Sequence, residues 1–131
     1  MAILLIIILS FIGHFVGDYI LQTDFLAKAK SEKFWENTND KHGWIMILLA
    51  HSVLWSAAIM LPWLIAIYPA FIDGALRPTI SFAVLFVTNV AVHFFVDNLK
   101  CKGHTTLALD QILHFIQIAC TSAIMANMAG V

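Results

Sequence analysis

The sequence predicts an all-α fold, an integral membrane four-helix bundle, on three observations. First, 61% of the 131 residues are hydrophobic and only 11% are charged, which is unusual for a soluble domain. Second, no charged residue occurs in the windows 1–17, 43–72, 78–96 and 111–131. Third, each window is long enough to span or nearly span a bilayer, for which a helix needs roughly 20 residues. We therefore expect a single transmembrane domain over residues 1–131, with helices at about 2–25, 41–68, 78–100 and 106–129.

The first expected helix, 2–25, combines a close-packing motif with a polar stripe. Gly13 and Gly17 form a small-x3-small pair, which permits the close approach of a neighbouring helix. His14, Asp18 and Gln22 recur every four residues, so they lie along one side of the helix. One face of this helix is therefore expected to be polar.

The next two elements are a polar connection and the second membrane helix. The connection contains several lysines with Phe34 and Trp35, which suits a short interfacial helix at the headgroup boundary. The second membrane helix, 41–68, has His51 as the one ionisable residue inside its apolar window, and Pro62 is expected to kink or loosen it. It is the one span without a continuous polar face.

The last two expected helices, 78–100 and 106–129, each carry polar residues at helical spacing. Asn89, His93 and Asp97 are four residues apart and share one face of the third helix. Asp110, His114, Gln117 and Thr121 follow the i, i+4, i+7 rhythm on the fourth helix. Hydrogen bonds between helices explain Asn89, Gln111 and Gln117 without any chemistry.

The basic residues predict how the bundle is oriented. Arg77 lies in the second connection, whereas the other six of the seven Lys and Arg residues flank the first and third connections: Lys28, Lys30, Lys33, Lys41, Lys100 and Lys102. By the positive-inside rule, these two connections face the cytoplasm. We therefore expect a multi-pass protein of the bacterial inner membrane with both termini outside.

Histidines and aspartates from all four helices are expected to meet at a similar depth, within about 15 Å of the cytoplasmic helix ends. Ionisable residues inside a membrane are costly unless they are paired or bound to something, and bundle cores are common places for metal sites. Imidazole and carboxylate ligands suit a divalent metal, zinc in the first place and iron or manganese as alternatives. The candidate metal ligands are His14, Asp18, His51, His93, Asp97, Asp110 and His114.

These candidates exceed what one tetrahedral zinc ion needs. Either two metals bind, or some of the residues orient ligands and act as a general base. Asp18 and Asp110 are the candidate catalytic residues for this second role. A structural alternative is that His and Asp only hold the helices together, but such hydrogen bonds are worth only about 0.6 kcal/mol on average.

The order of the polar residues resembles that of a known family. His14-x3-Asp18-x3-Gln22 is followed by His51, then by His93-x3-Asp97 and finally by Asp110-Gln111-x2-His114. This order resembles small bacterial and phage polytopic membrane proteins of unknown function, over nearly the whole chain. It is more loosely similar to inner-membrane metal-dependent hydrolases, which also place His and Asp near helix ends. The resemblance implies metal chemistry and names no reaction.

The expected function is that of a membrane-embedded metal-dependent hydrolase acting on a lipid or lipid-linked substrate near the cytoplasmic face. One alternative is a proton- or divalent-cation-coupled transporter, for which four helices are few and a homodimer would be needed. Others are a structural membrane protein with a metal site and a di-iron oxidoreductase, although the His boxes of membrane desaturases are absent. Membrane lipid is the expected partner, and nucleic acid is not, because a net charge of −1 provides no basic surface.

Overall fold

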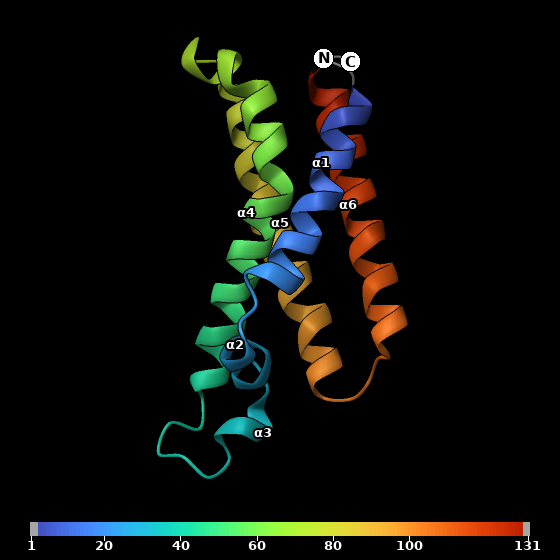
Figure 1. Ribbon diagram of the computed structural model, residues 1–131. Coiled ribbons are helices and arrows are strands. Elements are labelled where there is room, and N and C mark those ends of the chain that lie inside the picture. The colour runs from blue at the N-terminus through green and yellow to red at the C-terminus, as the bar shows by residue number, and fades with distance from the viewer. Residues whose placement is uncertain (1–2, 130–131) are drawn as a thin grey trace.

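The computed structural model describes residues 3–129 and confirms the all-α class. The start of the first expected helix, at residue 2, lies outside the described residues. Figure 1 shows the helices, which are in chain order α1 (Ile3–Phe15), the π-helix η1 (Val16–Ile20), α2 (Asp24–Ala29), α3 (Glu32–Trp35), α4 (Gly43–Ile72), α5 (Leu76–Cys101) and α6 (Leu107–Ala129).

Four helical stretches are long and apolar enough to cross a membrane: Ile3–Ile20, Gly43–Ala70, Thr79–Cys101 and Leu107–Met128. Large apolar side chains such as Leu4, Ile65 and Val87 are exposed on their outer surfaces. Helices of a soluble bundle instead present a polar face to water. This chain is therefore a membrane protein.

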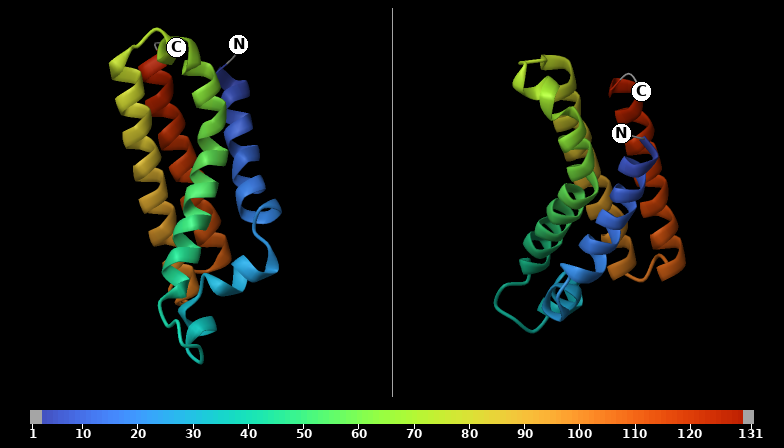
Figure 2. Two further views of the ribbon diagram at one scale, coloured as in Figure 1. Left: turned by 90° about the vertical axis from the view of Figure 1, so that its left-hand side faces the viewer. Right: turned by 45° about the horizontal axis from the view of Figure 1, so that its top comes forward.

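The four long helices form a bundle with its connections at opposite ends. α1 and α5 each pack against both α4 and α6, and two further views show the helices side by side (Figure 2). The chain ends lie at one end of the bundle, and α2, α3 and the α5–α6 connection lie at the other (Figure 1). We call this second end the α2 end.

The first membrane helix ends at Ile20, earlier than the expected residue 25, because a new helix, α2, begins at Asp24 with Thr23 as its N-cap. The backbone of Thr23 is extended, and its Oγ1 accepts a hydrogen bond from the Leu26 amide at 3.3 Å, as an N-cap residue does. α2 then packs against α4. Trp35 of α3 supports this connection, since its Nε1 donates to the Ala29 carbonyl at 2.6 Å.

The two glycines of α1 and η1 confirm the close approach predicted from the sequence. A Cβ atom on Gly13 would lie 2.3 Å from the carbonyl oxygen of Ala58, and one on Gly17 would lie 2.9 Å from Cδ1 of Trp55. Real Cβ atoms do not approach that closely, so only glycine allows this spacing of α1 and α4.

The core is apolar toward the chain termini and polar toward the α2 end. Two clusters of buried apolar side chains are built around Trp63 and Trp55. Between α5 and α6, Asn89 Oδ1 accepts hydrogen bonds from Gln117 Nε2 at 2.9 Å and from Thr121 Oγ1 at 3.0 Å. This confirms the helix–helix hydrogen bonds expected of Asn89 and Gln117.

Candidate metal centre

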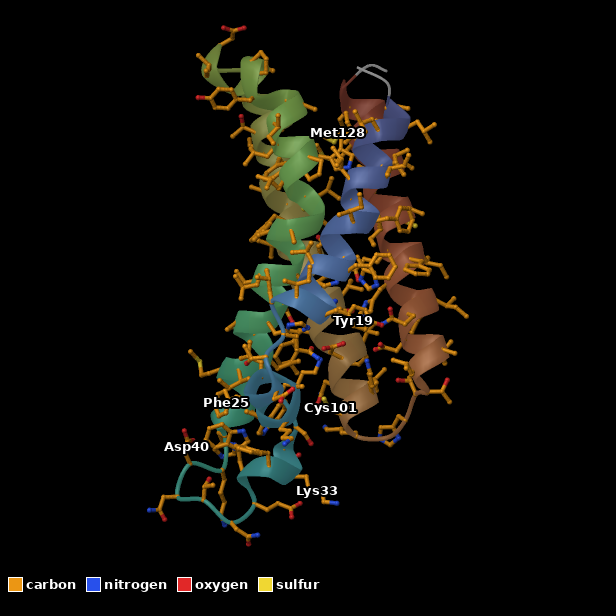
Figure 3. The ribbon with its side chains drawn as sticks, in the orientation of Figure 1. Tyr19, Phe25, Lys33, Asp40, Cys101 and Met128 are labelled. Atoms are coloured by element: carbon orange, nitrogen blue, oxygen red, sulfur yellow. The ribbon has the colours of Figure 1, made fainter. Side chains whose placement is uncertain are left out.

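The seven predicted ligands come from α1, η1, α4, α5 and α6 and are buried in the half of the bundle nearest the α2 end. Six of them are at most 2% exposed, and the side chain of the seventh, Asp18, is 9% exposed. Figure 3 shows nitrogen and oxygen atoms gathered between the helices beside Tyr19. The side chains must find partners there, because water is largely excluded.

Three imidazoles and two carboxylates face one another at the centre of this region. His51 Nε2 lies 3.4 Å from Asp18 Oδ1 and also 3.4 Å from Asp97 Oδ2. His114 Nε2 lies 3.4 Å from Asp97 Oδ1. His93 Nε2 lies 3.9 Å from Asp18 Oδ1 and 3.8 Å from Asp97 Oδ2. These separations are longer than those of ordinary hydrogen bonds.

Most of these central atoms have no hydrogen-bond partner. Asp18 Oδ1, His51 Nε2, and both ring nitrogens of His93 and His114 are buried and unpartnered among the described residues. Buried polar atoms are nearly always hydrogen-bonded. A group of unpaired lone-pair atoms at such spacing is what a metal ion would bind.

Two overlapping groups have ligand atoms close enough to hold an ion. Asp18, His51 and His93 form one group, and His93, Asp97 and His114 form the other, with all ligand atoms of a group within 4.8 Å of one another. Because His93 belongs to both, the groups mark adjacent positions in one site. Two histidines and one carboxylate, with a further position open, is a ligand set of catalytic zinc sites.

His14 lies beside this centre, but both of its ring nitrogens are engaged. Trp55 Nε1 donates to His14 Nδ1 at 3.0 Å, and His14 Nε2 lies 3.0 Å from Gln111 Oε1. An indole N–H can only donate a hydrogen bond, so His14 Nδ1 is the acceptor. The ring proton of His14 is therefore on Nε2, which donates a hydrogen bond to Gln111 Oε1. His14 Nδ1 also lies 3.5 Å from Asp18 Oδ2. In this arrangement His14 positions its neighbours and has no nitrogen free for a metal.

Asp110 is similarly held by neighbouring side chains. Its Oδ2 accepts hydrogen bonds from Lys100 Nζ at 2.7 Å and from Gln111 Nε2 at 3.1 Å. Its Oδ1 has no hydrogen-bond partner and lies 3.5 Å from His114 Nε2. Asp110 belongs to neither three-residue group, so it adds negative charge beside His114 from the edge of the site.

The structure adds Lys30, which belongs by sequence to the polar connection after the first membrane helix. Its Nζ donates to Asp97 Oδ2 at 2.6 Å and to Gln22 Oε1 at 2.7 Å, and the residue is only 6% exposed. No pattern in the sequence predicts this position, because Lys30 is brought to the site by the change of chain direction after Ile20. An ammonium group buried against a carboxylate is part of the site rather than of the surface.

Trp55 is a second residue that the structure adds to the site. Its ring stacks on that of His93, with centroids 4.1 Å apart and planes 19° from parallel, in addition to its hydrogen bond to His14. A signal was present here, because Trp55 follows His51 by four residues and therefore shares its helix face. Trp55 fixes the orientation of two of the histidines.

Comparison with known proteins identifies the family of this chain. A family model described as a protein of unknown function (DUF3307) matches residues 5–130. The chain belongs to this family. The match confirms the resemblance to a family of unknown function over nearly the whole sequence. No curated protein and no solved structure matches the chain.

The charges in the site of this DUF3307 chain do not cancel. Asp18, Asp97 and Asp110 contribute three negative charges, while Lys30 and Lys100 contribute two positive ones, so the net charge is −1 with neutral imidazoles. A net charge is expensive in a medium of low dielectric constant. The site is therefore suited to bind one or more cations.

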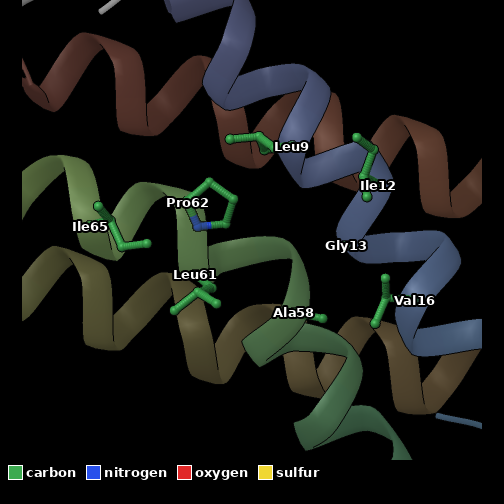
Figure 4. Close-up of a pocket in the computed structure, with 8 residues that line it drawn as sticks. All are labelled: Leu9, Ile12, Gly13, Val16, Ala58, Leu61, Pro62 and Ile65. Atoms are coloured by element: carbon green, nitrogen blue, oxygen red, sulfur yellow. The ribbon is translucent and has the colours of Figure 1, made fainter. Parts of the chain in front are cut away.

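A polar cavity of about 160 Å³ adjoins the centre on the side of η1 and α6. We call it the lysine cavity; its lining residues are Asp18, Tyr19, Gln22, Lys30, Lys100, Leu107 and Gln111. A second cavity, of about 320 Å³, lies between α1 and α4 and is apolar (Figure 4). Side chains such as Ile12 and Ile65 line it, and none of the candidate ligands does. The lysine cavity thus reaches a metal-ligand candidate, Asp18.

Proposed function

We propose that this protein is a membrane-embedded metal-dependent hydrolase acting on a lipid or lipid-linked substrate. The observation that carries the proposal is the group of buried, unpartnered donor atoms on Asp18, His51, His93 and His114. Polar helix packing alone would pair these atoms with one another, as it pairs Asn89 Oδ1 with Gln117 Nε2 and Thr121 Oγ1. A divalent ion would give a partner to one ring nitrogen of each histidine that binds it.

We assign His93, Asp97 and His114 as the ligands of one ion, with zinc as the first choice and iron or manganese as alternatives. His51 and Asp18 form the second group with His93 and complete the site. One divalent ion would change the net charge of the site from −1 to +1, whereas two would bring it to +3. The smaller residual charge favours a single ion.

Each polar neighbour then has a role in hydrolysis. A bound divalent ion would supply an activated water near neutral pH and polarise the oxygen of the bond to be cleaved. Asp18 is the general base, because its Oδ1 is unpartnered and because it lines the lysine cavity. Lys30 lies next to Asp97 and is placed to stabilise negative charge that develops on the substrate. Asp110, predicted as an alternative base, is held by Lys100 and Gln111 instead.

We further propose that the site lies on the cytoplasmic side of a bacterial inner membrane and that both chain termini lie outside. Six of the seven basic residues lie at the α2 end, which supports a cytoplasmic location for that end. His51 and His93 lie about two helical turns inside the ends of α4 and α5. A labile bond near the lipid headgroups would therefore be within reach.

The other half of the bundle argues against a transport pathway. Among the described residues, the buried polar side chains toward the termini are Ser10, Ser56, Asn89, Gln117, Thr121 and Ser122, none of which titrates. A proton or cation pathway needs ionisable or coordinating groups across the membrane. The arrangement supports a site that is closed at its outer end.

Elemental analysis of protein purified without chelator tests the metal site. We expect close to one zinc, iron or manganese per chain in wild type and in His104→Ala, whose side chain is exposed in the α5–α6 connection. We expect the metal to be lost in His93→Ala and in His114→Ala. Metal-free wild type, or full metal content in both of these variants, would overturn the proposal.

Turnover and transport assays then distinguish the functions. If the metal-containing protein releases a product from lipid, the protein is a hydrolase. If Asp18→Asn retains the metal but loses this turnover, Asp18 is supported as the general base. Metal flux into liposomes without any lipid turnover would replace the hydrolase by a transporter. The exposed-histidine variant His104→Ala serves as the control in both assays.

A further inference from the structure

The lysine cavity presents positive charge and unused hydrogen-bond donors to whatever enters it. Lys30 Nζ donates to Asp97 and Gln22, and Lys100 Nζ donates to Asp110. Each ammonium group has more N–H donors than these contacts use. The one acidic residue that lines the cavity is Asp18, so its wall combines two cations with the proposed general base.

We propose that the lysine cavity binds the phosphodiester group of a membrane phospholipid, and that this is the substrate class of the hydrolase. The inference rests on the function proposed above. Lys30 and Lys100 hold the non-bridging phosphate oxygens through charge-assisted hydrogen bonds. Gln22 and Gln111, which also line the cavity, provide further amide groups at its rim.

Charge balance selects a phosphodiester over other ester groups. With one divalent ion, the three carboxylates and two lysines leave the site at +1. A phosphodiester carries one negative charge and brings the total to zero. A neutral carboxylic ester would leave the charge at +1, and a fully ionised phosphomonoester would reverse it to −1. A net charge of zero has the lowest electrostatic free energy for a site inside a membrane protein.

The position of the cavity selects a lipid over a soluble diester. Asp18 and Lys100 both belong to membrane-spanning stretches, near the ends of Ile3–Ile20 and Thr79–Cys101. This is the depth at which the hydrocarbon core of a bilayer gives way to the headgroups. Tyr19 and Leu107 line the cavity and are both 59% exposed. They give its rim apolar surface for the glycerol and first acyl carbons.

The reaction would consume water and no other co-reactant. The water oxygen forms a bond to phosphorus while the bond from phosphorus to one alcohol oxygen breaks. Asp18 takes a proton from the water and passes it to the leaving alcohol. The products are a phosphomonoester and an alcohol, so atoms and charge balance.

The test uses zinc-containing full-length protein in dodecyl maltoside micelles with three probes: phosphatidylglycerol, diacylglycerol and soluble glycerophosphoglycerol. Binding is measured by the shift in the thermal unfolding midpoint, and turnover by the phosphomonoester or fatty acid released. We expect phosphatidylglycerol to raise the midpoint and to be cleaved, and the other two probes to do neither. Equal binding of glycerophosphoglycerol would overturn the assignment to a lipid.

Variants of the two lysines test which groups hold the phosphate. Lys100→Met and Lys30→Met should weaken phosphatidylglycerol binding by about tenfold or more, with the metal content unchanged. Lys28→Met is the matched control, because Lys28 is an exposed residue of α2 outside the cavity. Lys100 is partly exposed, so Lys100→Met provides the test if Lys30→Met does not fold. Unchanged binding in a folded lysine variant would overturn the inference.

The two proposals can fail separately. Metal-dependent cleavage of diacylglycerol without binding of phosphatidylglycerol would overturn the phosphodiester assignment and leave the hydrolase standing. Lysine-dependent binding of phosphatidylglycerol without turnover of any probe would support the phosphodiester site and overturn the hydrolase.

Discussion

The ammonium nitrogen of Lys30 lies 2.6 Å from Oδ2 of Asp97, although 67 positions separate these residues in the sequence. The contact connects the polar segment after η1 to the centre of the membrane bundle. It brings a positive charge to within hydrogen-bond distance of a proposed metal ligand.

Removing Lys30 should destabilise the metal-free protein. Lys30→Met leaves the buried carboxylate of Asp97 without its ion-pair partner, which costs about 3 to 5 kcal/mol in buried pairs. The free energy of unfolding is to be measured after chelation, with Lys28→Met as the control for loss of a lysine from α2. Adding Asp97→Asn to Lys30→Met should recover part of the loss, because both charges are then gone. Additive effects in this double-mutant cycle would show that the two side chains are not coupled.

The hydrogen bond from Trp55 to His14 should make Trp55 less replaceable than Trp63. Both tryptophans are fully buried, but Trp63 Nε1 has no hydrogen-bond partner within the part of the chain that the structure describes, whereas Trp55 Nε1 donates to His14. Trp55→Phe should therefore cost about 1 to 3 kcal/mol more than Trp63→Phe, since it leaves His14 Nδ1 unpaired. Thermal unfolding in detergent provides the comparison. Equal losses of stability would mean that the hydrogen bond contributes nothing.

Gly13→Ala should destabilise the packing of α1 on α4. The added methyl group would meet the carbonyl oxygen of Ala58 at 2.3 Å, and backbone atoms cannot rotate out of the way as a side chain can. Overpacking of this kind costs about 1 to 3 kcal/mol. Leu4→Ala, on an exposed part of the same helix, should have a smaller effect. The unfolding midpoints of the two variants decide the matter, and an unaffected Gly13→Ala would contradict the close approach.

Asn89→Ala should lower the stability of the bundle without changing its metal content. Gln117 and Thr121 both donate to Asn89 Oδ1, so both lose an acceptor. We expect a stability loss of about 1 kcal/mol, given that such bonds in membrane proteins are worth about 0.6 kcal/mol each on average. The metal content should stay at the wild-type level. Loss of metal from a folded Asn89→Ala protein would show that this layer is coupled to the centre.

Removal of the metal should lower the stability of the whole bundle. The ligands come from different helices, so a bound ion links them and stabilises the folded state by mass action, by about 2.7 kcal/mol at a hundredfold excess over Kd. Chelation should lower the unfolding midpoint of wild type, and added zinc should restore it. In His114→Ala, chelator and zinc should have little effect. A wild-type midpoint that does not respond to chelation would contradict a structural contribution from the ion.

Much of the site could be anticipated because α-helices impose a regular spacing on the sequence. The pairs His14/Asp18, His93/Asp97 and Asp110/His114 stand four residues apart, and the helix places each pair on one face. The antiparallel order of the spans then predicts their depth. The contacts at 3.4 to 3.9 Å between His51, His93, Asp18 and Asp97 agree with this expectation. Their roles as ligands stay predictions until metal is measured.

The sequence could not show that His14 and Asp110 are held by other side chains whereas other candidate ligands keep unpartnered atoms. This difference depends on contacts between segments that are distant in the sequence. Trp55 and Gln111 occupy both nitrogens of His14, while Lys100 and Gln111 hold Asp110. Several histidines and aspartates compete for a few partners in the interior. Which of them remain unpaired is decided by rotations of helices and side chains that leave no periodic mark in the sequence.

Composition and helical periodicity are local properties of the chain. They determine the number of helices, the apolar length of each helix and the helix faces that carry His and Asp. The helix end at Ile20, the burial of Lys30 against Asp97 and the cavity beside Asp18 arise only when the segments pack together. A lysine in a polar connection has the same local sequence whether it faces water or a carboxylate inside the bundle. Tertiary contacts decide between the two, because the energy of a buried charge depends on the partner it finds.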